Sequence, residues 1–145
     1  MKLVLPLLSI LALSACGDTQ HAAYLIAGPQ HSLTLTRQQD FVGSDWNTEL
    51  IVANFPECQR RYAMTNMAGD NIKMDVYRAE PGVFILNSAK RWYVTETKTC
   101  RFEQFKAPPP EPGDVIGSFL AKDGKLEYKS KEEKKPSAPT SAAKP

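Results

Sequence analysis

The stretch Ser32-Leu33-Thr34-Leu35-Thr36 alternates hydroxyl and leucine side chains residue by residue. Because successive side chains of a β-strand point to opposite faces, this pattern predicts a strand with both leucines on one face. The same period of two continues in Ile72 to Ala79, where Ile72, Met74 and Val76 share a face. The repeated pattern predicts a mainly β chain.

Turn-forming residues separate the expected strands. Pro81-Gly82 fits the two central positions of a type II turn, and Asp123-Gly124 is a strong hairpin signal. Residues 48–55 are compatible with a short helix capped by Ser44, but the β-branched residues in this stretch favour a strand. We expect a single antiparallel β-sandwich or small barrel, built as a meander of about six to eight strands.

Arg91 to Phe105 is the longest expected strand. Its even positions are largely apolar and include Cys100, whereas its odd positions carry threonine and arginine. We therefore expect the face that holds Trp92 and Cys100 to lie on the core. The segment exceeds the ordinary length of a strand, so a bulge or bend is expected at 96–98.

The N-terminal segment has the layout of a secretory signal. Lys2 precedes an apolar run from Leu3 to Leu13, and small residues follow it. This run is shorter than the roughly 20 residues that a membrane-spanning helix needs. It ends in Leu13-Ser14-Ala15-Cys16, which resembles the lipobox of bacterial lipoproteins.

The resemblance implies that Cys16 carries a lipid anchor. In that family the cysteine thiol receives a diacylglycerol, the peptide bond before it is cut, and the new amine receives a fatty acid such as palmitate. In Gram-negative bacteria, aspartate directly after the cysteine favours retention in the inner membrane, whereas here Gly17 follows. We therefore expect an outer-membrane protein that faces the periplasm, with the inner membrane as the less favoured site. The alternative is an ordinary secreted protein in which Cys16 stays free.

The lipoprotein resemblance also implies a disulfide. With Cys16 acylated, Cys58 and Cys100 are the remaining cysteines in an oxidising compartment, which favours a bond between them. The alternative is a metal or redox pair. It is disfavoured because the sequence has no Cys-x-x-Cys spacing, and His21 and His31 lie far from both cysteines in sequence.

The chain divides into four expected parts: a signal peptide (1–15), a tether (16–30), a β domain (31–129) and a disordered tail (130–145). Within the domain, 106–113 contains four prolines and is expected to form an extended connector. The tail is rich in Lys, Glu, Pro, Ser and Ala and has no apolar anchor, which is typical of disorder. The domain has no basic stripe, so we expect no nucleic-acid partner.

No catalytic, cofactor-binding or metal-binding residue is expected from the sequence. Met64, Met67 and Met74 are of a type that binds copper(I), but methionines near strand ends are more often core residues. His31 at the start of an expected strand is typical of a solvated surface position. Neither histidine has a sequence context that suggests acid–base catalysis.

A candidate partner surface contains residues of the types that are enriched at binding hot spots. Its members are Arg60, Arg61, Tyr62, Arg91 and Tyr93. The ordinary alternative, which we favour, is that the arginines pair with acidic residues across strands and that Trp92 belongs to the core.

These observations favour a non-enzymatic binding or assembly module. We expect its partners to be the membrane, through Cys16, and an envelope protein or the cell wall. The alternative is a small-ligand carrier or sensor built as a partly empty β-barrel. A cavity of several hundred cubic ångströms inside a closed barrel would identify the carrier.

Overall fold

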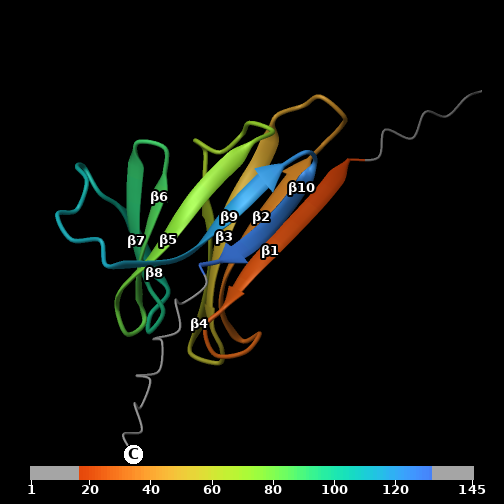
Figure 1. The fold of residues 1–145 in the computed structure, drawn as a ribbon. Helices are drawn as coiled ribbons and strands as arrows, with labels where there is room; N and C mark the ends of the chain where they lie inside the picture. Colours follow the sequence, from red (N-terminus) through yellow and green to blue (C-terminus); the bar gives the residue numbers. More distant parts are fainter. Residues whose placement is uncertain (1–16, 132–145) are drawn as a thin grey trace, which may run out of the picture.

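The computed structural model describes residues 17–131, which form ten strands in two antiparallel sheets (Figure 1). The two sheets pack against each other through a common hydrophobic core. In spatial order the first sheet contains β1 (Asp18–Leu25), β2 (His31–Gln39), β3 (Trp46–Asn54) and β4 (Cys58–Ala63). The second contains β10 (Lys125–Ser130), β9 (Asp114–Lys122), β5 (Ile72–Glu80), β6 (Val83–Ser88), β7 (Arg91–Glu96) and β8 (Arg101–Gln104).

The structure confirms the mainly β fold and the strand assignment for 48–55, of which 48–54 lie in β3. It has more strands than the six to eight expected, and the sheets form an open sandwich rather than a closed barrel. No helix long and apolar enough to cross a membrane occurs among residues 17–131. The signal peptide, Cys16 and most of the expected tail (132–145) lie outside the described residues.

The segment expected to be a tether is largely strand β1, which is a correction to the domain boundary. β1 pairs along its whole length with β2, from Asp18 opposite Gln39 to Leu25 opposite Ser32. Its inward residues include Tyr24, whose ring contacts two aromatic rings of the second sheet. Small and polar residues dominate its other positions, and they conceal the period of two. The folded domain therefore begins at β1 and extends to Ser130 at the end of β10.

The expected single strand from Arg91 to Phe105 is wrong, because the chain reverses direction completely at residues 97–100, where we expected only a bulge or bend at 96–98. β7 and β8 pair antiparallel, with Glu96 opposite Arg101. The reversal changes which residues face the core: Tyr93 and Thr95 are buried, whereas Trp92 lies on the outer face against Tyr77, with ring centres 5.5 Å apart. The expectation that Trp92 belongs to the core is therefore also wrong.

The core is filled by large side chains from both sheets. The period of two predicted its members in β2 and β5, since Leu33, Leu35, Met74 and Val76 are all fully buried. The three methionines that resemble copper ligands are core residues as well. The largest buried side chains are Arg37, Phe84, Phe119, Leu33, Leu35, Leu50, Met64, Met67, Met74, Leu86, Val52 and Val76.

The two lateral sides of the sandwich are closed differently. On one side β1 lies beside β10, and Gln20 Nε2 donates a hydrogen bond of 2.7 Å to the carbonyl of Gly124. On the other side the edge strands β4 and β8 are linked through the disulfide between Cys58 and Cys100. We call this second side the β4–β8 seam.

Candidate functional site

The disulfide at one end of the β4–β8 seam is confirmed. Cys58 is the first residue of β4, and Cys100 directly precedes β8, with their Cα atoms 5.9 Å apart. Cys100 is fully buried and has a positive φ of 57°. The bond joins the first sheet to the second at strands that share no ladder, so it holds the two edges together.

Three aromatic rings continue the seam beyond the disulfide. The ring of Phe102 stacks against Tyr62 of β4 and Tyr93 of β7, with centroids 4.8 Å and 5.1 Å apart. Tyr62 donates its hydroxyl to the carbonyl of Cys100 at 2.5 Å, and Tyr93 donates to Asn66 Oδ1 at 2.8 Å. Both hydroxyls thus have partners inside the protein, and the rings fix the spacing of the two edges.

Burial raises the pKa of Tyr93, and the interactions of its hydroxyl with Arg91 and Asn66 oppose this effect. Tyr93 is only 4% exposed. It therefore offers no ring to a partner, contrary to the sequence-based expectation.

The seam brings together four of the five residues of the predicted partner surface. Tyr62 and Tyr93 meet through Phe102, and Arg91 lies on β7 two residues before Tyr93. Arg60 is exposed on β4 between Cys58 and Tyr62.

Arg61 points away from the seam, from the opposite face of β4. Its Nη1 forms an exposed ion pair of 3.2 Å with Glu49 of β3. This is the cross-strand pairing that the ordinary alternative predicts. Surface pairs of this kind contribute little to stability, so Arg61 is held only loosely.

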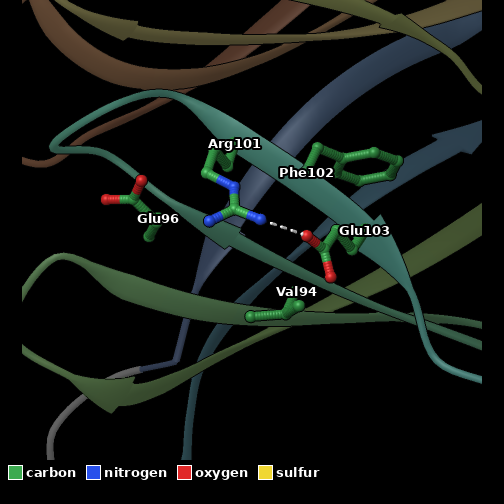
Figure 2. A pocket seen from close by; sticks show the side chains of 5 residues that line it. All are labelled: Val94, Glu96, Arg101, Phe102 and Glu103. Carbon is green, nitrogen blue, oxygen red and sulfur yellow. Dashed lines mark hydrogen bonds and ion pairs between the residues drawn. The ribbon is translucent and has the colours of Figure 1, made fainter.

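A hollow of about 220 Å³ lies beside the seam on β7 and β8 (Figure 2). Its polar side chains already have partners: Arg101 Nη2 donates to Glu103 at 2.7 Å. Glu96 accepts hydrogen bonds from the backbone amides of Lys98 and Thr99 and from the Thr99 hydroxyl. These bonds, led by the Thr99 hydroxyl, lower the pKa of Glu96. The hollow is therefore a product of the β7–β8 turn and offers few free groups to a ligand.

A second hollow of about 380 Å³ lies at the other end of the second sheet, and most of its lining residues are of polar type. Its charged pair is internal, since Lys73 Nζ lies 3.0 Å from Asp75 Oδ1, and Ser118 also donates to Asp75. Residues 17–131 contain no group of three His, Cys, Asp or Glu side chains placed to hold a metal ion. The lining is Asn66, Asn71, Ile72, Lys73, Asp75, Asn87, Ser88 and Ala89.

Sequence reasoning missed the buried arginine of β2. Arg37 is 1% exposed and donates through Nη1 to the carbonyl of Asp70 at 3.2 Å and through Nη2 to that of Gly69. Burial lowers the pKa of Arg37, and the charge of Asp70 opposes this effect. The available signal was its position, because the alternation of β2 places residue 37 on the same face as Leu33 and Leu35.

The two histidines lie on neighbouring strands of the first sheet, His21 on β1 and His31 on β2. His31 Nε2 lies 2.9 Å from Thr97 Oγ1, and this contact links the start of β2 to the β7–β8 turn. His21 is exposed on β1. The chain matches no protein-family model, no curated protein and no solved structure.

Proposed function

We propose that this chain is a lipid-anchored protein of the outer membrane that faces the periplasm and acts as a non-enzymatic binding or assembly module. The lipobox resemblance at Leu13 to Cys16 supports the anchor. The Cys58–Cys100 bond is consistent with the proposed oxidising compartment.

The open sandwich over a filled core is the observation that carries the choice of a binding module. A carrier needs an internal cavity of several hundred cubic ångströms to enclose its ligand. Here Phe84, Phe119 and Arg37 occupy the space between the sheets, and each is at most 1% exposed. Recognition must then use the surface and the strand edges.

The β4 edge is the part of the surface that best fits an extended partner. In the described part of the chain, β4 pairs with β3 on one side and with no strand on the other. Unpaired strand edges bind extended segments by strand addition. Gln59, Arg60 and Arg61 are exposed along β4, so an acidic segment of an envelope protein or an anionic cell-wall polymer fits this edge.

The anchor is tested by Cys16→Ala in the native host. We expect an unprocessed precursor that lacks the acyl groups by mass spectrometry and is lost from the outer-membrane fraction. Acylation of the wild-type protein at Cys16 supports the proposal. An unmodified wild-type thiol, or unchanged membrane partition of the variant, contradicts it.

The binding edge is tested by photo-crosslinking in intact envelopes. A crosslinking residue at Gln59 should give a defined adduct that Arg60→Glu abolishes. The same residue at Glu127, on β10 at the far side of the sandwich, is the matched control and should give none. Equal adducts at both positions, or none at either, would contradict a binding role for β4. A small molecule retained by the purified protein would favour the carrier instead.

A further inference from the structure

We propose that the end of the sandwich carrying Phe41 and Val42 rests on the lipid surface, with both side chains in the bilayer interface. This inference rests on the proposed lipid anchor and adds an orientation to it. The domain would then stand upright on the membrane, with the β4–β8 disulfide end turned toward the periplasm.

The chain leading to Cys16 emerges beside the loop that carries these two side chains. Asp18 starts β1 opposite Gln39 at the end of β2. Gly17 packs closely against Asp40, the residue that follows Gln39. A Cβ on Gly17 would lie 2.9 Å from the Asp40 carbonyl oxygen. Cys16 directly precedes Gly17 in the sequence, so the proposed anchor is one residue along the chain from this contact.

The loop between β2 and β3 presents its apolar residues to solvent. Phe41 is 55% exposed and Val42 is 87% exposed. A tight turn holds them there, because the Ser44 amide donates to the Phe41 carbonyl at 3.0 Å and Gly43 has a φ of 91°. Single exposed apolar residues are ordinary on protein surfaces, but two at the tip of one fixed turn beside an anchor point form a contact for lipid.

The charges around this end favour apolar contact over attraction to anionic lipid. The β9–β10 turn, held by the Gln20 bond to Gly124, lies at the same end of the sandwich (Figure 1). Lys122 ends β9 and Lys125 starts β10, so both flank this turn. The carboxylates closest to Phe41 and Val42, in the chain or by strand pairing, are those of Asp18, Asp40 and Asp45. The occupant we infer is therefore the uncharged and zwitterionic part of the bilayer, and contact should depend little on salt.

The opposite end provides a matched control. Phe55 is 56% exposed and follows β3, where its amide donates to the Gln30 carbonyl just before β2. With nine residues in β2, the two phenylalanines are separated by roughly 30 Å at about 3.3 Å per residue. An upright domain therefore places Phe41 in the interface and Phe55 far above it.

The experiment uses the full acylated protein, purified in detergent and reconstituted into phosphatidylcholine vesicles with brominated acyl chains. Phe41→Trp and Phe55→Trp are compared, each against the wild-type protein, which supplies the background of the two native tryptophans. Bromine quenches tryptophan only at short range. We expect roughly half of the added fluorescence to be quenched in Phe41→Trp, with little quenching in Phe55→Trp, because an interfacial side chain lies at the acyl boundary.

The outcomes separate the inference from the proposed function. Vesicle-bound, acylated protein with no quenching in Phe41→Trp overturns the upright orientation and leaves the anchor intact. Equal quenching of both variants also overturns it, since the domain would then lie on its side. Protein that carries no acyl group by mass spectrometry and does not bind vesicles overturns the anchor and the orientation together.

Discussion

The guanidinium carbon of Arg37 lies 4.4 Å from the centre of the Trp46 indole ring, inside the sandwich. The two side chains also share a partner, because Arg37 Nη1 donates to the Asp70 carbonyl and Trp46 Nε1 donates to Asp70 Oδ1 at 2.9 Å. Together they fasten the segment before β5 to the first sheet. This cluster ties a loop to the sandwich and carries no chemistry of its own.

Replacing Arg37 by methionine should destabilise the protein strongly. The substitution removes the hydrogen bonds that the charged Arg37 donates to the carbonyls of Gly69 and Asp70, and hydrogen bonds to charged groups contribute about 1.5–3 kcal/mol each. We expect a loss of about 3 kcal/mol in the free energy of unfolding, measured by urea titration with tryptophan fluorescence. Arg61→Met is the control, because its ion pair is exposed and should cost less than about 1 kcal/mol. Similar losses in both variants would refute this role for Arg37.

Reduction of the disulfide should lower stability by about 4 kcal/mol, as the chain-entropy model gives for a sequence separation of 42. The unfolded chain gains freedom when the bond between Cys58 and Cys100 is broken. Urea unfolding with and without a phosphine reductant measures the difference. The double variant Cys58→Ala/Cys100→Ala should be insensitive to the reductant. A wild-type midpoint that does not move would show that the bond contributes nothing.

The sequence predicted the strands and turns in which the residue type matches the burial or the backbone conformation of its position. Leu33 and Leu35 alternate with hydroxyl residues because one face of β2 is buried, and the structure buries both leucines. Gly82 adopts the positive φ that a type II turn requires, and Asp123 and Gly124 both have positive φ in the β9–β10 hairpin. At these positions the residue type follows directly from the backbone it must adopt.

The reversal within 91–105 could not be predicted, because no residue there is a usual turn former. Thr97, Lys98 and Thr99 continue the alternation of β7 in sequence. The turn is instead made by the Glu96 carboxylate, which accepts backbone amides from within the turn, and by Cys100 in the left-handed region. Residues of β1 gave no clear signal for a similar reason, since most of its side chains are small or polar and exposed.

The candidate site was predicted by residue type and only partly by position. Tyr62 and Tyr93 do meet, but through Phe102 and within the packed seam. Which face of β7 lies inward depends on the β7–β8 reversal, so an error there moved Tyr93 from the core to the surface. Arg37 was overlooked because the alternation identifies position 37 as inward but does not reveal the hydrogen-bond partners that allow an arginine to be buried there.

Glu96→Ala should destabilise the β7–β8 turn by about 1 kcal/mol, as loss of a side-chain cap on backbone amides does. The pKa of Glu96 is lowered below its ordinary value, chiefly by the Thr99 hydroxyl, so its contribution is complete at neutral pH. That contribution should be lost as the pH falls through the lowered pKa, because protonation removes the acceptor. Thermal midpoints of wild type and variant, followed from pH 7 downward, should therefore converge as the pH falls through the lowered pKa of Glu96. Glu127→Ala, on the solvent face of β10, is the control and should leave the pH 7 midpoint nearly unchanged.

Tyr128 should make the protein less stable in strong alkali. Burial raises the pKa of Tyr128 to about 12, with the negative charge of Tyr24 as a second cause, and its hydroxyl has no hydrogen-bond partner among the described residues. In the unfolded chain a tyrosine titrates near pH 10, so above about pH 10 the unfolded state releases a proton that the folded state retains. The contribution of Tyr128 is therefore complete below pH 10 and is lost as the pH rises toward 12.

Tyr128→Phe removes this part of the pH dependence, and it should leave stability at pH 7 equal or slightly higher because an unsatisfied buried hydroxyl is removed. Urea midpoints at pH 7, 9 and 11 measure both effects. Parallel pH profiles for wild type and Tyr128→Phe would show that the hydroxyl is solvated in the folded protein.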